Sequence, residues 1–397
     1  MPEQRAGKSG APEKKTKKPK GQLDVYLIII VGILLIFGLI MLTSASSYTA
    51  QINAKYGNDA FYFVKRQALC MGIGIVFMFI TAFIPYSVWK KIWWLVFGGS
   101  FLIMFLVVTP LGFEVNGARR WLSLGSFSLQ PAELLKIGVI IASAAVITIC
   151  IKHIKQLKAY IFSVIFCIAG AGVTALVTDD LGTAVIIVLI GFIMLIIVGA
   201  DKKHLLITIG LGLGAVAGMI ALKPYRFARI LAWFNVEANA SGDSYQIMQA
   251  LYAIGSGGFF GKGLGKSTQK LGFVPESQND MIFSIICEEL GIVGALVLIA
   301  LFVLLILRLR KIYNDCDDIF GKLIVAGVMI HLAGQAFINM GVVTSLLPNT
   351  GVPLPFISNG GTAVIFTLVE IGLALSVGFY SAKEKAKAAL IKAESLK

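Results

Sequence analysis

Ten long apolar stretches restrict the fold of this chain more than any other feature. A membrane-spanning helix needs about 20 predominantly apolar residues. With 57% hydrophobic and 14% charged residues, a chain of 397 residues could not hide so much apolar surface from water. We therefore expect an all-α polytopic membrane protein with ten transmembrane helices. The ten segments are 24–45, 66–84, 92–111, 132–150, 159–178, 182–200, 204–222, 281–306, 322–345 and 361–380.

Lysine and arginine are distributed unevenly between the two sets of connections. An even number of spans puts both termini on one side, and that side holds 23 of the 35 Lys and Arg residues, against 12 on the other. Cytoplasmic connections are enriched in cations, so both termini are predicted to be cytoplasmic. We expect residues 1–22 to form a disordered basic tail, 23–381 the membrane domain and 382–397 a second basic tail.

The predicted outer connections are unusually rich in polar residues, glycine and proline. They comprise 116–133, 178–182, a large extracellular loop at 223–280 between the seventh and eighth helices, and 346–362. Such loops are not needed merely to reverse a chain, which places function on the outer side. The last of them, LLPNTGVPLPFISNGGT, contains three prolines and cannot be helical throughout. We expect it to fold back as a re-entrant wall.

Asp280 stands at the mouth of the eighth apolar segment, within VPESQNDMIFS. It could simply cap the helix, or it could act as a general base whose basicity is raised by partial burial. Glu288 lies further along the same helix and could line the same cavity more deeply, whereas Glu289 on the opposite face is expected to pair with another helix. Acidic groups at membrane depth are functional candidates by default.

The first outer loop combines Arg119 and Arg120 with the neighbouring Trp121, and Glu133 and Lys136 follow at helical spacing. Arginine can clamp phosphate groups bidentately. Interfacial anchoring by Trp and Arg is the simpler explanation. Because a buried Glu/Lys pair exceeds what anchoring requires, we favour a binding site here.

The glycine-rich stretch GSGGFFGKGLGKSTQKLG invites a nucleotide-binding interpretation, which its spacing excludes. A P-loop has the pattern GxxxxGK[ST], so the GKS at Gly265 would need another glycine five residues earlier. Phe260 occupies that position. Lys262, Lys266 and Lys270 instead suit a flexible basic lip that meets anionic lipid headgroups. The alternative is a solvated loop with incidental lysines.

A polar stripe follows one face of the ninth segment. His331, Gln335 and Asn339 recur every four residues. Hydrogen bonding between helices explains such a stripe better than catalysis does.

Taken in order, these loops resemble the SEDS family, the FtsW/RodA/SpoVE proteins. The matching stretches are NGARRWLSLGSFSLQPAE, DLGTA, PYRFARI, YQIMQALYAIGSGGFFGKGLGKSTQKLGFVPESQNDMIFSIICEELG and LLPNTGVPLPFISNGG. The resemblance implies an inverting peptidoglycan glycosyltransferase that polymerises lipid II at the outer face of the bacterial cytoplasmic membrane. It also implies a class B penicillin-binding protein (a transpeptidase) and other divisome proteins as partners. The YQIMQALYAIGSGG stretch resembles the FtsW/SpoVE branch, which implies division or sporulation, and an elongation-type RodA polymerase remains the alternative.

The resemblance also assigns roles to residues. The essential aspartate of the family matches Asp280, its Arg-Trp pair matches Arg120 and Trp121, and Ser358 lies in the matched ISNGG stretch. The chain departs from the family where Asn359 replaces a usual Tyr, Asp179 a usual Pro and Met281 a usual Phe.

The implied chemistry agrees with the residues already singled out. Asp280 would take the proton of the attacking sugar hydroxyl. Arg119 and Arg120, with either Lys136 or the long-loop lysines Lys262 and Lys266, would bind the substrate and neutralise the leaving pyrophosphate. A divalent cation, Mg²⁺ or Mn²⁺, near Asp280 would help in the same way. No nucleotide and no nucleic acid are expected. A flippase for lipid-linked sugars, or a scaffold whose buried acids are structural, are the competing functions.

Overall fold

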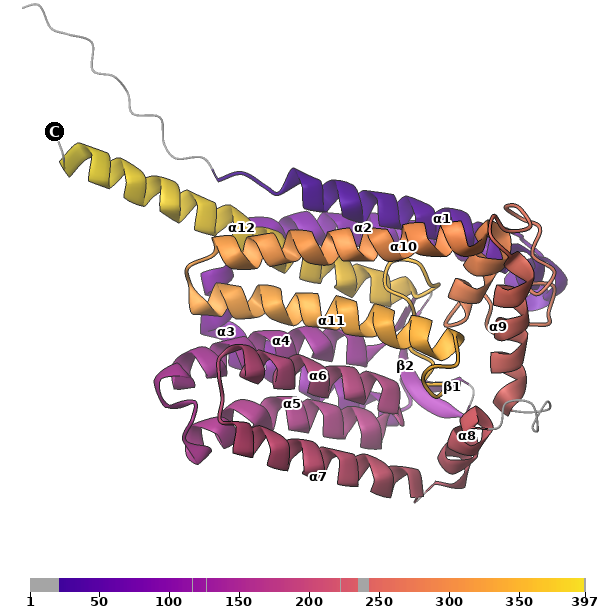
Figure 1. Cartoon of the computed structure of the whole chain (residues 1–397), viewed down its shortest axis with the longest axis horizontal. Helices are drawn as coiled ribbons and strands as arrows, with labels where there is room; N and C mark the ends of the chain where they lie inside the picture. Colours follow the sequence, from indigo (N-terminus) through magenta and orange to yellow (C-terminus); the bar gives the residue numbers. More distant parts are fainter. Residues whose placement is uncertain (1–20, 116, 126, 222, 235–242, 396–397) are drawn as a thin grey trace, which may run out of the picture.

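The computed structural model describes residues 21–395 except 116, 126, 222 and 235–242, and the predicted disorder of residues 1–20 falls outside this part. The described chain is a bundle of long helices with a small sheet and two short helices at one end (Figure 1). The long helices are α1 (Val25–Ile52), α2 (Tyr62–Phe83), α3 (Tyr86–Phe105), α4 (Pro131–Cys150), α5 (Leu157–Val177), α6 (Leu181–Ile197), α7 (Lys202–Ala221), α10 (Ile282–Asp315), α11 (Ile319–Val343) and α12 (Gly361–Ser395). The two short helices are α8 (Pro224–Phe234) and α9 (Asp243–Gly257), both within the predicted large loop.

The long helices agree with the expected polytopic all-α fold. Within the described residues, nine helices are long and apolar enough to cross a membrane, and α6 is a shorter apolar helix of 17 residues. The count of ten spans therefore remains a prediction. The most enclosed spans are α4, α11 and α12. In each of them 72% of the most apolar 18-residue stretch is buried, compared with 6% in α7. The core thus follows α4, α11 and α12.

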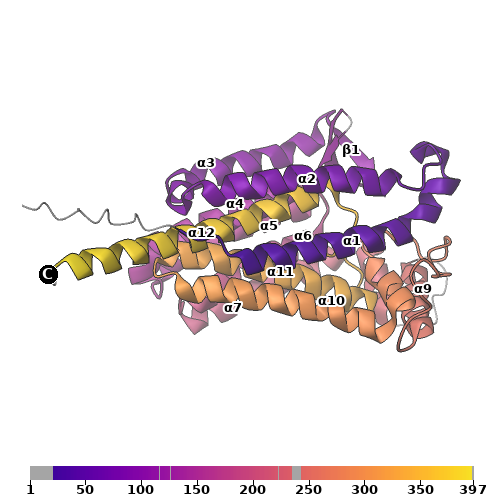
Figure 2. The same cartoon turned by 90° about the horizontal axis from the view of Figure 1, so that it is seen from above.

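The two ends of the bundle differ in character. We call the end that carries the sheet, α8, α9 and the segment 258–281 the site end, and the opposite end, where α1 begins and α12 ends, the terminal end (Figures 1 and 2). Almost every unusual polar loop in the sequence lies at the site end. The start of α1 and the end of α12 lie at the same end of the bundle, and α12 extends well beyond the start of α1 (Figures 1 and 2).

The predicted outer loop 116–133 contributes to a small antiparallel sheet, which is added to the expected helical fold. Strands β1 (Gly112–Val115), β2 (Ala118–Leu124) and β3 (Phe127–Leu129) lie in the order β1-β2-β3, with Trp121 opposite Phe113. The turns between them contain Gly117 and Gly125 at φ of 79° and 67°, a conformation that favours glycine. These two glycines, flanking an alternating run, were a readable hairpin signal.

Candidate functional site

Asp280 lies in a turn just before α10, with an intermediate exposure to solvent. Burial raises the pKa of its carboxyl from 3.8 to about 7, and the negative charge of Glu276 adds to the rise. Hydrogen bonds from the backbone amides of Asp280 and Met281 and the positive charge of Arg229 lower the pKa only in part. A carboxylate with these properties can accept a proton near neutral pH.

The turn that carries Asp280 is held by two asparagines, Asn339 on α11 and Asn359 in the re-entrant segment. The Asn339 Nδ2 group of α11 donates to the Asp280 carbonyl oxygen at 2.7 Å and to the Val352 carbonyl oxygen at 2.8 Å. Asn359 donates from its backbone to the Gln278 carbonyl oxygen at 2.9 Å and from Nδ2 to Asn279 Oδ1 at 3.1 Å. The Asn359 that departs from the family pattern therefore ties the re-entrant segment to the turn that carries Asp280.

Helix α10 is broken nine residues after its first residue. Gly291 adopts φ 66° and ψ −165°, a combination open essentially to glycine alone, so the helix consists of two halves. The backbone of the preceding loop bridges the break. The amides of Lys262 and Gly263 donate to the carbonyls of Glu288 and Glu289 on one side, each at 2.9 Å. On the other side the amides of Ile292 and Val293 donate to the carbonyls of Gly258 and Phe259 at 3.0 and 3.2 Å.

Glycine is required where the loop touches the break. A Cβ on Gly261 would lie 2.2 Å from the Glu289 carbonyl oxygen, and a Cβ on Gly257 would lie 2.0 Å from that of Cys287. The glycine-rich sequence thus allows close backbone packing against α10. We call the segment 257–263 the splint, because it fixes the short half-helix that follows Asp280.

Glu288, fully buried, is saturated with contacts from the loop. Its Oε1 accepts from Lys262 Nζ at 2.6 Å and from the amide and hydroxyl of Thr268 at 3.1 and 2.9 Å. Its Oε2 accepts a short hydrogen bond from the Ser267 hydroxyl and one from the Gln269 amide at 3.3 Å. The predicted substrate-binding residues Glu288 and Lys262 therefore bind one another.

Glu289 is equally enclosed and pairs with α1, as expected. Its carboxylate accepts from Ser44 Oγ at 2.6 Å and from Lys270 Nζ at 2.8 Å, and the Gly265 amide donates to it at 2.9 Å. Next to Ser44, the Ala45 carbonyl oxygen accepts from Ser277 Oγ at 3.3 Å, three residues before Asp280. Two neighbouring residues of α1 thus hold both the loop and the turn that carries Asp280. Lys266 lies exposed on the loop surface.

The Arg-Trp pair lies on β2 and contacts the turn between α5 and α6. Arg120 donates from Nε to the Thr178 carbonyl oxygen at 3.2 Å and from Nη2 to the Asp179 carbonyl oxygen at 2.7 Å. Asp179, where the family often has proline, has φ 53° and an ion pair with Lys223 at 2.9 Å. Arg119 is exposed and Trp121 half-buried. Asp180 caps α6 by accepting from the Thr183 amide at 3.0 Å.

The predicted Glu133–Lys136 pair is buried and continues into the polar stripe of α11. Lys136 Nζ lies 2.9 Å from Glu133 Oε1 and donates to Gln335 Oε1, also at 2.9 Å. His331 contacts Gln335 Oε1 at 2.7 Å and Glu370 Oε2 at 2.6 Å. The prediction that the stripe serves hydrogen bonding between helices is confirmed.

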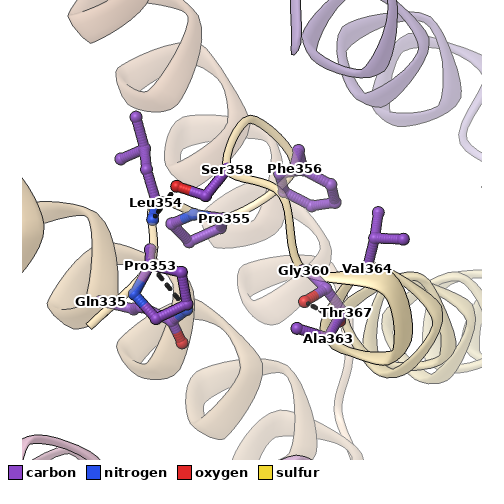
Figure 3. Close-up of a pocket in the computed structure, with 10 residues that line it drawn as sticks. All are labelled: Gln335, Pro353, Leu354, Pro355, Phe356, Ser358, Gly360, Ala363, Val364 and Thr367. Carbon is purple, nitrogen blue, oxygen red and sulfur yellow. Dashed lines mark hydrogen bonds between the residues drawn. The ribbon is translucent and has the colours of Figure 1, made fainter. Parts of the chain in front are cut away.

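The re-entrant segment is irregular, as predicted, and encloses a narrow pocket beside α11 and α12 (Figure 3). Ser358 Oγ accepts from the Leu354 amide at 2.8 Å, and Gln335 Nε2 donates to the Pro353 carbonyl oxygen at 2.9 Å. The pocket volume is about 10 Å³. Since that is room for about one water molecule, a sugar substrate must bind outside it.

Sequence reasoning missed Gln67 and Ser44, which fix the same end of the molecule. Gln67, 1% exposed on α2, donates to the Ser358 carbonyl oxygen at 3.2 Å and accepts from the Gly360 amide at 3.3 Å. A glutamine within an apolar span was the available signal. Ser44 carried none, since serine is common in such helices.

Comparisons with known proteins show the family to which the chain belongs. The family model described as "Cell cycle protein", which represents FtsW, RodA and SpoVE, matches residues 25–383. "Stage V sporulation protein E" of Bacillus subtilis (strain 168) is 36% identical over 359 residues, covering 90% of this chain and 97% of that protein. "Probable peptidoglycan glycosyltransferase FtsW" of Geobacter sp. (strain M18) is 36% identical over 360 residues, covering 89% and 96%.

Solved structures show the same fold. One chain, from a study titled "Structural coordination of polymerization and crosslinking by a peptidoglycan synthase complex", superposes with a TM-score of 0.75 at 26% identity, covering 90% of this chain and 98% of that one. The rod shape determining protein RodA of Thermus thermophilus gives 0.64 at 27% identity, with coverage of 90% and 96%. The chain is therefore a multi-pass membrane protein that belongs to the FtsW/RodA/SpoVE family.

Proposed function

We propose that this protein is a peptidoglycan glycosyltransferase that polymerises lipid II into glycan strands at the outer face of the bacterial cytoplasmic membrane. The observation that carries the proposal is Asp280, a partly exposed carboxylate whose pKa is raised to about 7. It lies in a turn that is fixed from α1, α11 and the re-entrant segment. The names of the relatives supply the reaction class.

Asp280 acts as the general base. It accepts the proton of the acceptor sugar hydroxyl as that oxygen attacks the anomeric carbon of the donor. The bond from that carbon to the lipid pyrophosphate breaks, and attack from the opposite side inverts the carbon. Because the splint and the asparagines hold the turn still, the carboxylate needs little reorganisation on reaction.

The pyrophosphate requires positive charge. Arg119 and Lys266 are exposed at the site end and can approach it directly. Arg120 uses Nε and Nη2 on the 178–179 turn, so its contribution includes shaping that turn. Lys136 is buried against Glu133 and Gln335 and acts from within the bundle, as part of the support of the site.

A divalent cation beside Asp280 fits the oxygen donors. No group of three or more His, Cys, Asp or Glu suited to a metal occurs in the described part of the chain. Mg²⁺, however, is often bound by one or two carboxylates together with substrate phosphates. Asn339 Oδ1 is buried and has no hydrogen-bond partner among the described residues, and its amide contacts the Asp280 backbone. When bound by Asp280 and Asn339, Mg²⁺ or Mn²⁺ would neutralise pyrophosphate charge.

The partner we propose is a class B penicillin-binding protein that cross-links the strands, with other divisome proteins around it. The similar chain in a peptidoglycan synthase complex supports a cross-linking partner. Relatives named for sporulation and for FtsW support the division or sporulation branch.

The test is polymerisation by the purified protein, reconstituted with its transpeptidase partner and lipid II. Asp280→Asn should fold normally and lose activity by about 10²–10⁴-fold, the range for removal of a general base. Asp59→Asn, which removes an exposed carboxylate of the same end, should leave activity unchanged. Polymer formed by Asp280→Asn at the wild-type rate would refute the assignment.

Transport of lipid-linked sugars is the alternative function, supported by the many spans and the buried ion pairs. The same vesicles distinguish it. If the wild-type protein moves lipid II between leaflets and forms no polymer under any condition with its partner, transport is the function.

A further inference from the structure

A polar pocket is lined by residues of the terminal end of the bundle, the end away from α9 and β1 in Figure 2. It has a volume of about 360 Å³ and is formed by the start of α1, the end of α10 and the part of α12 around residue 382. Five charged residues line it, namely Asp24, Arg308, Lys311, Asp315 and Lys385. The proposed chemistry uses none of them, so the pocket needs an explanation of its own.

Arg308 is held in a fixed orientation in this pocket. Its Nε donates to Asp24 Oδ1 at 2.7 Å, and its Cζ lies 4.7 Å from the centroid of the Tyr26 ring. Asp24 is itself fixed, because the same oxygen caps α1 through the Leu27 amide at 2.9 Å. The two Nη groups of Arg308 donate to no described residue. An oriented guanidinium with its Nη groups available suits a phosphate.

The other charges set the sign of the ligand. Lys311 follows Arg308 by three residues and therefore lies on the same face of α10. Lys385 on α12 has a long ion pair with Asp317 at 3.2 Å, both side chains being largely exposed, which is a weak contact. The pocket lining itself carries three cations and two carboxylates, which is one excess positive charge, and the exposed Asp317 outside the lining offsets Lys385 only weakly.

Exposed apolar side chains occur on α1 and α10 within five residues of Asp24 and Arg308 in the sequence. Ile29 on α1 is 51% exposed, and Leu304 and Leu307 on α10 are 49% and 52% exposed. The two helices pack against one another. A phosphate bound at Arg308 would thus have apolar surface beside it for acyl chains, which a free phosphate ion does not need.

We propose that this pocket binds the headgroup phosphate of an anionic glycerophospholipid in the cytoplasmic leaflet. Basic pockets between helix ends on the cytoplasmic side recognise such headgroups. The positive-inside distribution places the terminal end on that side. The proposal is independent of the proposed catalysis, since the two sites lie at opposite ends of the bundle.

The experiment is lipid retention by the full chain, purified from nanodiscs of equal parts phosphatidylglycerol and phosphatidylcholine and measured by native mass spectrometry. The wild type should retain phosphatidylglycerol preferentially. Arg308→Gln/Lys311→Gln/Lys385→Gln should lose the preference, at about fivefold per cation removed. The matched control Lys91→Gln/Lys152→Gln/Lys155→Gln removes the same charge from exposed positions of the same end. Equal loss in both triple variants would mean diffuse surface attraction and would overturn the proposal.

A second variant guards against misfolding, because Arg308 also contacts the cap of α1. Lys311→Glu reverses one charge at an exposed position and should by itself weaken retention of phosphatidylglycerol. Retention equal to wild type would contradict the proposal. Inorganic phosphate distinguishes the ligand source: if it displaces the lipid completely at millimolar concentration, the pocket is a site for free phosphate and the lipid assignment is wrong.

Discussion

Asp280 and the pair Glu288 and Glu289 lie within ten residues of one another, yet their surroundings assign them different roles. The two glutamates are fully buried, and each accepts hydrogen bonds from a lysine, a hydroxyl and loop amides. No ion pair of Asp280 is present among the described residues, and its side chain keeps contact with solvent. Both carboxylate groups of the glutamates are thus occupied as hydrogen-bond anchors, whereas the carboxylate of Asp280 remains accessible to another group.

The comparison shows that the position of an acid at a membrane boundary does not by itself reveal chemistry. The number of hydrogen-bond and ion-pair partners around the carboxylate is the more informative feature. Glu288 and Glu289 fix the loop and the broken helix, and the rigid unit that results holds Asp280 in a site where few groups stabilise its charge. Substitutions that alter one side of this contrast test it.

The largest effect is expected at the Glu289–Lys270 pair. Glu289→Gln leaves Lys270, whose side chain is 7% exposed, as an uncompensated buried cation. Breaking a buried pair in this way costs about 3–5 kcal/mol. The double variant Glu289→Gln/Lys270→Met should regain most of the loss, because it removes both charges. Thermal unfolding of the wild type, the two single variants and the double variant measures these differences in stability. Equal stability of the single variant and wild type would show that the pair does not anchor the loop.

A pH profile tests the other side of the contrast. The polymerisation rate should fall about tenfold per pH unit below about 7, because the base must be ionised.

The stability of the folded protein should instead decrease as the pH rises. The folded carboxyl ionises near 7 and the unfolded one near 3.8, so the folded state binds the extra proton between these values and loses stability as pH rises across them. Asp280→Asn should therefore melt above wild type at about pH 8, and the two should converge toward about pH 4. A polymerisation rate that stays constant down to about pH 5 would show that Asp280 is not the base.

A smaller effect is expected from Arg120→Lys. Lysine keeps the charge and loses the fork that contacts the carbonyls of Thr178 and Asp179. Loss of one or two such hydrogen bonds predicts a fall of roughly tenfold in turnover. Arg310→Lys, at an exposed position of the terminal end, is the matched control. If both variants retain full turnover, Arg120 is only an anchor.

The smallest effect is expected at an exposed pair on the site end. Lys65 Nζ lies 2.7 Å from Asp59 Oδ2, with side chains that are 70% and 37% exposed. Solvent screens such pairs, so Lys65→Gln should change neither melting temperature nor polymerisation. A clear loss of activity would mean that the loop 53–61 takes part in the site.

The class of protein and the residues that are candidates for the site follow from the sequence alone. Apolar length fixed the helical spans because lipid offers no hydrogen bonds to the backbone, and motif spacing identified Asp280, Arg120 and the Glu133–Lys136 pair. The polar stripe of α11 was predictable from its period alone. These features depend on local chemistry and on residues near one another in the chain.

Which of these residues contact one another, and so which role each can have, depends on the tertiary structure. The sequence could not show that Lys262 is bound to Glu288 or that Asn339 and Asn359 hold the turn of Asp280, because these contacts join segments that are 26, 59 and 80 residues apart. Nor could it show the break at Gly291, since a single glycine in an apolar run is also compatible with a continuous helix. The number of hydrogen-bond partners distinguishes the anchoring carboxylates of Glu288 and Glu289 from the proposed base Asp280. Packing between segments that are distant in the sequence sets that number.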